Sequence, residues 1–454
     1  MKKMCNIPRV LIAGANSGCG KTSITCGILK ALCDRGLTVQ PYKCGPDYID
    51  PMLHSHITGR DCRNLDPFFS TGEDLRYLMA KDSQDVDFTV AEGVMGYYDG
   101  LGVSCEKSTY TVSKETKTPT ILIFNVKGMS HTMIPLMKGM IEYQENPVVG
   151  VILNRCTKGL YALMKPEIEE RLGIKVVGYF PQREGMSIGS RHLGLMTAAE
   201  IQNLDEVVAL LGQTAEEGID LDLLLEIGRQ AEALPEAKRP AAMSKKTRIA
   251  VAWDKAFCFY YRQNLEILED LGAELVAFSP VNDVKLPENI GGIYLGGGYP
   301  ETYRTKLSEN LSMKEEIRNA AKEGKPIFAE CGGFMYCCEN LVETDGSSKP
   351  MLGLIPTDCI MTKRLNMQFG YVTMEAQKDT AYFHKGERIR VHEFHYSKAE
   401  QRGDSCTITK NKGRSWEGLY VKGNILSGYP HFYFHNCIDV AQKFVNLSAD
   451  HQQQ

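Results

Sequence analysis

Short apolar runs alternate with longer amphipathic stretches along the first half of the chain. Four of these runs are RVLIAGA at 9–15, DFTVAEGV at 87–94, TPTILIFNV at 118–126 and VVGVILN at 148–154. Apolar runs of this length, separated by helical patterns, are typical of parallel strands that helices cover on both faces. The pattern therefore predicts a doubly wound α/β domain.

The alternation stops in EALPEAKRPAAMSKKTR, residues 232–248, where proline, alanine and basic residues take over as they do in linkers. Apolar runs return afterwards as RIAVAW, LGAELVAFSP, IGGIYLGGGYPE and KPIFAECGG. We therefore predict a first domain at 1–235, a linker at 236–247 and a second α/β domain at 248–454. Each domain is long enough to enclose a hydrophobic core.

The composition excludes several classes of protein. The 454 residues carry a net charge of −4 and include 15 cysteines, none of them spaced as C-x-x-C. No stretch of about 20 residues is apolar throughout, so neither a membrane-spanning helix nor a nucleic-acid surface is indicated. Cysteines without paired spacing favour reduced thiols over disulfides or a zinc ribbon. We expect a cytoplasmic protein with small-molecule partners.

A glycine-rich loop, GANSGCGKTS at Gly14–Ser23, follows the first predicted strand and precedes a helical pattern. In this context, the backbone N–H groups of the loop and the helix N-terminus can bind phosphate oxygens. Lys21 would then reach the β- and γ-phosphates, and the Thr22 hydroxyl would bind Mg²⁺. The predicted ATP-binding residues of the loop are Gly14, Ser17, Gly18, Gly20, Lys21, Thr22 and Ser23.

The loop departs from the strict phosphate-loop pattern. Ala15 stands where G-x-x-x-x-G-K-T has its first glycine, and Gly14 precedes it, so the loop is a lengthened variant. Partitioning-type ATPases carry a second lysine five residues before Lys21, where this chain has Asn16. A partitioning-type ATPase switch is therefore the distant alternative for this half of the chain.

Acidic residues gather in three glycine- or proline-containing turns, which are KCGPDYIDP at 43–51, NLDP at 64–67 and AEGVMGYYDG at 91–100. Each turn follows or ends a predicted strand. Because the carboxyl ends of parallel strands meet at one edge of the sheet, we expect these acids to lie beside the phosphate loop. Glu92 is placed like the acid of a Walker-B motif and is the candidate Mg²⁺ ligand.

The stretch AECGGFMYCC at 329–338 reads as the end of a buried strand, a tight turn and a helix. Cys331 lies at the turn, with two glycines behind it, which is the arrangement that exposes a nucleophile above a sheet. The helix N-terminus is expected to favour the Cys331 thiolate. Cys337 and Cys338 are expected about two turns into the helix, as apolar packing.

A thiol nucleophile needs a base, and the sequence offers three places for it. His431, in LSGYPHFYFHN, follows a late apolar run, His435 is its rival, and HEFH supplies His392 and His395. The backbone N–H groups of Gly332 and of the Gly297–Gly298 turn are the candidate oxyanion hole.

Together these motifs resemble the cobyrinate a,c-diamide synthases, in which a dethiobiotin-synthetase-like ATPase domain is fused to a class I glutamine amidotransferase domain. The resemblance covers essentially the whole chain. It is carried by AGANSGCGKTS, YKCGPDYIDPMLH, NLDPFF, AEGVMGYYDG, SRHLGL at 190–195, GGGYPE, AECGGFMY, HEFHYS and the closing YPH.

The resemblance implies that Cys331 attacks the side-chain amide of glutamine and that His431, in the Y-x-H context of the family, is its base. Members often carry a second histidine where this chain has Tyr433. It also implies that the released ammonia reaches the ATPase domain. There, Mg²⁺-ATP phosphorylates an acetate of a corrinoid, and ammonia displaces the phosphate to give the amide.

The resemblance also implies roles for the acidic turns. Lys43 would contact phosphates or the attacking carboxylate, and Asn154 would read the adenine. Asp47 would join Thr22 and Glu92 around Mg²⁺. The motifs placed around the tetrapyrrole contain Asp47, Tyr48, Asp50 and Asp99.

Two further alternatives stay open within this family resemblance. Nickel-sirohydrochlorin or hydrogenobyrinate could replace cobyrinate as the substrate. The second domain could also be an inactive scaffold, although it retains both Cys331 and His431. Whether the protein forms a homodimer is left open too.

Overall fold

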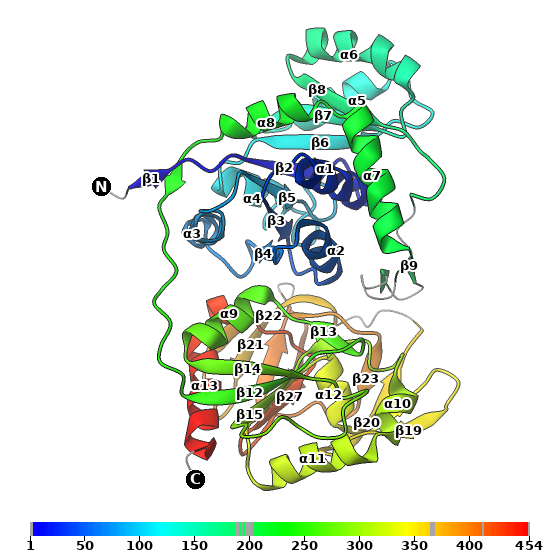
Figure 1. The fold of residues 1–454 in the computed structure, drawn as a ribbon. Helices are drawn as coiled ribbons and strands as arrows, with labels where there is room; N and C mark the ends of the chain where they lie inside the picture. The colour runs from blue at the N-terminus through cyan, green and yellow to red at the C-terminus, as the bar shows by residue number, and fades with distance from the viewer. Residues whose placement is uncertain are drawn as a thin grey trace. The chain divides into compact units, whose positions relative to one another are not determined.

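The computed structural model describes residues 3–186, 190–191, 194–195, 201, 203–363, 368–410 and 413–452. It forms two compact units, Met1–Arg239 and Pro240–Gln454 (Figure 1). Residues 236–246, next to this division, have no helix or strand.

The first unit is built on a seven-stranded sheet in which all neighbouring strands are parallel. Figure 1 shows helices packed along it. The strands, in spatial order, are β4 (Arg63–Leu65), β3 (Val39–Cys44), β5 (Phe88–Glu92), β2 (Arg9–Gly14), β6 (Thr120–Asn125), β7 (Val148–Asn154) and β8 (Lys175–Phe180).

Helices cover both faces of this sheet. Val10 and Ile12 of β2 belong to one buried apolar cluster, and Leu11 and Ala13 to another, so successive side chains of the same strand enter opposite cores. The prediction of a doubly wound domain is confirmed. The helices are α1 (Lys21–Asp34), α2 (Ile49–Thr58), α3 (Gly72–Asp82), α4 (Thr109–Glu115), α5 (Met133–Glu142), α6 (Lys158–Leu172), α7 (Leu204–Gly218) and α8 (Leu221–Arg229).

Two small antiparallel pairs complete the first unit. β1 (Met4–Cys5) pairs with β11 (Leu234–Pro235), which joins the two ends of this unit. β9 (Ser190–Arg191) pairs with β10 (Gly194–Leu195). The remaining residues of the SRHLGL motif, 192 and 193, lie outside the described residues.

The second unit has a six-stranded main sheet, parallel except for its last strand. A second α/β unit is therefore confirmed. The strands, in spatial order, are β14 (Ala273–Phe278), β12 (Thr247–Ala252), β15 (Gly292–Leu295), β17 (Ile327–Glu330), β27 (Ile425–Gly428) and β26 (Tyr420–Lys422). The helices are α9 (Arg262–Asp270), α10 (Arg304–Glu309), α11 (Leu311–Lys322), α12 (Gly332–Cys337) and α13 (Ile438–Gln452), with a 3₁₀ turn η2 at Phe434–Asn436.

Two four-stranded sheets lie, along the chain, between β17 and β27, and the sequence analysis did not anticipate them. One has the order β19 (Ser348–Pro350), β18 (Cys338–Val342), β20 (Ile355–Met361), β23 (Ser397–Ala399). The other has the order β22 (Arg388–Glu393), β21 (Gly370–Ala376), β24 (Cys406–Thr409), β25 (Ser415–Gly418). The short strands β13 (Phe257–Phe259) and β16 (Gly297–Gly298) form a further pair.

The expectation that Cys338 lies in the helix after Cys331 is wrong. Helix α12 ends at Cys337, and Cys338 begins β18, where it pairs with Ile355 of β20. In an extended conformation the side chains of Cys338 and Leu341 are buried, and the backbone N–H and C=O groups form hydrogen bonds within a sheet. Both cysteines are fully buried, as apolar packing requires.

All fifteen cysteines are free thiols. Within the described part of the chain, no helix is both long enough and apolar enough to cross a membrane.

Candidate active sites

The phosphate loop runs from the end of β2 into α1. Gly18 and Gly20 have φ angles of 74° and 100°, a region that favours glycine. A Cβ on Gly20 would also come within 2.1 Å of the Asn154 side-chain nitrogen. The Lys21 ammonium group is buried and donates to the backbone oxygens of Met95, at 2.6 Å, and of Asn16, at 3.3 Å. The Lys21 side chain therefore folds back over the phosphate loop, where its ammonium group would also contact a bound phosphate.

A buried charge cluster lies beside this loop at the carboxyl edge of the sheet. Lys43 of β3 pairs in register with Glu92 of β5, and its Nζ lies 2.8 Å from Glu92 Oε1. The same Nζ donates to Asp50 Oδ2, at the start of α2, at 2.5 Å. The Thr22 hydroxyl donates to Glu92 at 2.9 Å and lies 3.2 Å from Asp50 Oδ2. The acids thus gather next to the loop.

Mutual neutralisation shifts the pKa values of these groups. Burial would lower the pKa of Lys43, but Asp50, Glu92 and Asp47 raise it well above its ordinary value. Burial would raise the pKa of Glu92, but Lys43 and His54 hold it well below the usual range. Burial, followed by the Asp47 charge, raises the pKa of Asp50 to about 7. The cluster therefore keeps Lys43 and Glu92 charged at neutral pH.

The sequence analysis did not single out His54, which supports Glu92 from behind. It is fully buried on α2, and its Nε2 lies 2.8 Å from Glu92 Oε2. The signal was present in the sequence, because His54 lies four residues after Asp50 and therefore on the same helix face. His54 fixes the second oxygen of a carboxylate whose first oxygen contacts Thr22 and Lys43.

The side chains that could bind Mg²⁺ would do so through hydroxyl and carboxylate oxygens. No group of three or more His, Cys, Asp or Glu side chains suited to a metal occurs among the described residues. Mg²⁺, however, binds nucleotide sites through one or two protein ligands together with phosphates and water, and Thr22 with Glu92 fits that pattern. Asp47 instead caps α2, because its Oδ1 accepts from the N–H groups of Ile49 and Asp50.

The other predicted substrate residues surround the same edge. Tyr48 immediately precedes α2 and follows Asp47, whose carboxylate accepts from the first N–H groups of that helix. Asp99 accepts from Gly96 N–H at 2.9 Å, and a Cβ on Gly96 would lie 3.1 Å from the backbone oxygen of Ala15 in the phosphate loop. Asp99 thus shapes a turn that touches the loop.

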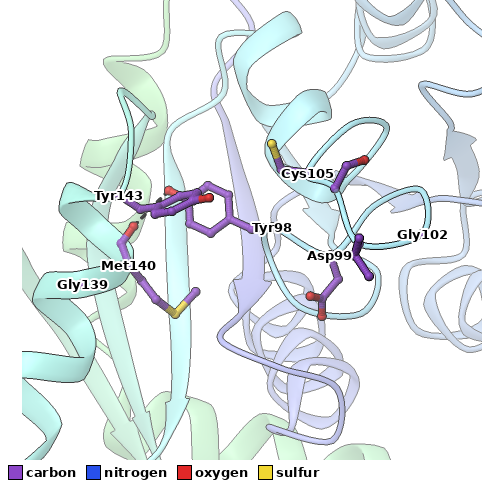
Figure 2. Close-up of a pocket in the computed structure, with 9 residues that line it drawn as sticks. Tyr98, Asp99, Gly102, Cys105, Gly139, Met140 and Tyr143 are labelled. Atoms are coloured by element: carbon purple, nitrogen blue, oxygen red, sulfur yellow. Dashed lines mark hydrogen bonds between the residues drawn. The ribbon is translucent and has the colours of Figure 1, made fainter.

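Asp99 also borders a cavity of about 520 Å³ between this turn and α5 (Figure 2). Figure 2 shows the rings of Tyr98 and Tyr143 near each other, and their centroids are 5.1 Å apart. Met140 and Val103 also line the cavity, and no lining residue is basic. The cavity therefore offers aromatic and apolar contacts, together with the Asp99 carboxyl group, and no basic group that would bind an anion.

Asn154, at the end of β7, holds the phosphate loop. Its Nδ2 donates to the backbone oxygen of Cys19 at 2.6 Å, and its Oδ1 accepts from Arg155 N–H. Its predicted contact with adenine stays a prediction.

Cys331 lies at the turn between β17 and α12, with φ at 47° and ψ at −98°. A positive φ at a residue other than glycine costs of order 1–3 kcal/mol and often marks a functional turn. Its N–H donates to the backbone oxygen of Gly428 at 2.8 Å, which joins it to the end of β27. Its Sγ lies 3.7 Å from the backbone oxygen of Phe394, in the HEFH segment.

Burial opposes the effect expected of the helix N-terminus, which is to favour the Cys331 thiolate. Burial raises the pKa of Cys331 far above its ordinary value, and the carboxylates Glu301, Glu393 and Glu330 add to the rise. Helix α12 has only six residues, so its dipole is small beside these effects. Burial therefore favours the neutral form of the Cys331 thiol.

Three candidate histidines gather near the turn after β27. His431 and His392 exchange backbone hydrogen bonds, at 2.8 and 3.2 Å. The His395 ring stacks on Tyr429 at 3.6 Å. Burial, together with His392 and His395, lowers the pKa of His431 to about 3, so its imidazole is neutral at pH 7. His435 lies further along, in η2, and is only half-buried.

The glycines proposed for the oxyanion hole lie between the cysteine and histidine turns. A Cβ on Gly332 would lie 2.9 Å from Gly298 N, and one on Gly297 would lie 2.6 Å from His431 Cε1. Side chains at these two positions would therefore collide with the site. This close packing brings the Gly297–Gly298 turn, the residue after Cys331 and the His431 ring together.

Comparison with known proteins defines the class of the chain first. The protein-family model described as a CobQ/CobB/MinD/ParA nucleotide binding domain matches residues 10–195. The model described as a CobB/CobQ-like glutamine amidotransferase domain matches residues 248–437. The chain therefore joins a nucleotide-binding domain to a glutamine amidotransferase domain.

Relatives along the full length identify the family. A cobyrinate a,c-diamide synthase of Caldanaerobacter subterraneus subsp. tengcongensis is 37% identical over 98% of this chain and 98% of its own. One of Clostridium tetani is 39% identical over 94% and 96%, and one of Thermoplasma volcanium 37% over 97% and 97%. The chain belongs to the cobyrinate a,c-diamide synthase family.

Similarity to solved structures is weaker. PurLQS from Thermotoga maritima aligns with 46% of this chain and 100% of its own, at 19% identity and a TM-score of 0.32, which is too low to locate functional residues.

The raised pKa of Cys331 predicts slow alkylation of the ligand-free protein. Because the thiolate is the reactive form, the rate of Cys331 modification by iodoacetamide should still be rising with pH at pH 9. Peptide mass spectrometry after timed quenching measures this rate, with the half-buried Cys105 as the internal reference. A rate that levels off below pH 8 would contradict the neutral resting thiol.

Proposed function

We propose that the protein uses ATP and glutamine to convert the a and c acetate groups of cobyrinate into amides. The observation that carries the proposal is the presence in one chain of two complementary sites. The first unit combines a phosphate loop with the Lys43–Glu92 charge cluster. The second holds a strained Cys331 next to the His431 turn. The names of the full-length relatives supply the substrate.

The second unit would release ammonia from glutamine. Cys331 Sγ attacks the side-chain carbonyl carbon, and His431 takes the thiol proton and passes it to the leaving nitrogen. Ammonia departs and leaves a γ-glutamyl thioester, which water hydrolyses to glutamate and the free thiol. The N–H groups of Gly298 and Gly332 would stabilise the oxyanion, with Gly297 leaving room for the His431 ring.

The first unit would activate the acetate. An acetate oxygen attacks the γ-phosphorus of ATP, ADP leaves, and ammonia then displaces phosphate from the acyl phosphate to form the amide. Lys21 and the loop N–H groups neutralise the phosphates. Thr22 and Glu92 would hold Mg²⁺, which supplies charge neutralisation at the phosphate oxygens, and Asp47 is a further candidate ligand.

The Lys43 ammonium group is buried among carboxylates, and it could exchange one of these ion pairs for a contact with an anionic substrate. We propose that it turns to a phosphate or to the attacking carboxylate, and that Asn154 reads the adenine. Tyr48, Asp50 and Asp99 would lie near the tetrapyrrole, whose flat, apolar ring suits the aromatic cavity beside Asp99. The free cysteines fit a reducing cytoplasm. A homodimer is not required by these steps.

Cys331→Ala should abolish glutamine-dependent synthesis and glutamine hydrolysis, because removal of a covalent nucleophile costs on the order of 10⁶ in rate. High ammonium chloride at mildly alkaline pH should restore amidation by Cys331→Ala but not by Lys21→Ala. Liquid chromatography with mass spectrometry of the corrinoid measures both arms.

Cys338→Ala is the matched control for that variant, since Cys338 is also buried but lies in β18. It should lose about 1 kcal/mol of stability and keep glutamine-dependent turnover. The glutaminase proposal fails if Cys331→Ala still hydrolyses glutamine.

Glu92→Gln should lower ATP-dependent amidation by at least about 100-fold, because it removes the charge that Thr22 and Lys43 contact. Glutamine hydrolysis should persist. His54→Asn, which removes only the support behind Glu92, should cost about 10-fold. Wild-type synthesis by Glu92→Gln would exclude Glu92 from the Mg²⁺ site.

Cobyrinate should be amidated at two acetates with two ATP consumed. Side-by-side assays with cobyrinate, hydrogenobyrinate and nickel-sirohydrochlorin, followed by mass spectrometry and ADP release, test the substrate. A strong preference for nickel-sirohydrochlorin would assign the sister activity instead.

A further inference from the structure

Glu330 is a buried carboxyl group that joins the two halves of the thiol site. It ends β17 and immediately precedes Cys331. Its Oε1 accepts a hydrogen bond from the backbone N–H of Phe432 at 2.6 Å, and Phe432 directly follows His431. Its Oε2 accepts from the Tyr294 hydroxyl at 2.7 Å. One side chain thus connects the strand of the nucleophile to the segment of the histidine.

A second buried side chain holds the other side of the same peptide. Asn264 of α9 donates from Nδ2 to the backbone oxygen of Phe432 at 2.7 Å, and its Oδ1 accepts from Phe434 N–H at 2.8 Å. Residues 432–433 belong to no strand or helix. Their backbone therefore depends on side chains for its direction, and both polar backbone groups of Phe432 are bonded to buried side chains.

A carboxyl group at position 330 would be unfavourable if the side chain served only to fill space in the core. Glu330 is 2% exposed, and buried acidic groups are rare unless they are paired or bonded. Burial raises its pKa to about 7, against the opposing effect of the bonds from Tyr294 and Phe432. An apolar residue of similar size would avoid this cost, but it would leave the Phe432 N–H without its acceptor.

We propose that Glu330 is a positioning residue, which sets the placement of the His431 imidazole relative to the Cys331 thiol by binding the N–H of Phe432. The inference rests on the proposed hydrolysis of glutamine. Proton transfer between thiol and imidazole needs the two groups to lie within hydrogen-bond reach of each other. A displacement of about 1 Å can cost about 100-fold in rate.

Two substitutions test the role from different sides. Glu330→Leu removes the acceptor, whereas Glu330→Asp keeps the carboxyl group but withdraws it by about one C–C bond, roughly 1.5 Å. Both should lower kcat for glutamine hydrolysis by about 10- to 100-fold, with KM for glutamine changed less than about threefold. Amidation driven by ammonium chloride should be unchanged. Glu330→Gln retains an amide oxygen for Phe432 N–H and should restore kcat to within about threefold of wild type.

Tyr294→Phe is the matched control, because it removes the other hydrogen bond of the same carboxyl group without removing the bond to Phe432. It should keep kcat within about threefold of wild type. Circular dichroism melting sets an assay temperature at which every variant is folded, and Glu330→Asp carries the test if Glu330→Leu does not fold.

The outcomes separate the inference from the proposed function. Wild-type kcat in Glu330→Asp, or a parallel loss of ammonia-driven amidation in the folded variants, would overturn the positioning role while leaving glutamine hydrolysis intact. Loss of activity in Tyr294→Phe equal to that of Glu330→Asp would also overturn it. A wild-type protein that hydrolyses no glutamine would overturn both.

Discussion

The parallel register between neighbouring strands decides which side chains meet at the carboxyl edge of each sheet. In the first unit, β3 and β5 pair so that Lys43 lies opposite Glu92. In the second, β17 and β27 pair so that Glu330 lies opposite Gly428, which places Cys331 and the His431 turn directly beyond the same edge. A register shift of one residue would turn each of these side chains to the opposite face.

Buried charge is the second constraint, because the first unit keeps ionised groups almost free of solvent. Lys43 and Glu92 are 3% and 0% exposed. Removing one member of such a pair commonly destabilises a protein by about 3–5 kcal/mol, since the remaining charge is left buried. The cluster therefore contributes to the stability of the fold. Its groups can also rearrange around phosphate, because Lys43 has three acidic neighbours between which it can exchange ion pairs.

Sequence patterns predicted the parts of the fold that depend on local chemistry. The apolar runs predicted the central parallel strands, and Cys331 with its glycines predicted a tight turn after a buried strand. Partners from distant segments could not be predicted this way. Glu330 and Asn264 both form hydrogen bonds with the backbone of Phe432, which is more than 100 residues away from each of them along the chain. Cys338 was misplaced because β18 is defined by its pairing with β20, and a short apolar run fits helix or strand equally well.

The two units manage charge in opposite ways, and the difference matches the ligands proposed for each. Lys43 and Glu92 stay ionised because each compensates the other, which suits a site for anionic phosphates and carboxylates. Cys331 and His431 stay neutral because burial disfavours their charged forms. Glutamine brings an uncharged amide to that neutral pair. In the proposed mechanism, negative charge develops at the carbonyl oxygen, beside the glycine N–H groups. The thiol would therefore lose its proton only when a substrate is present to accept the charge.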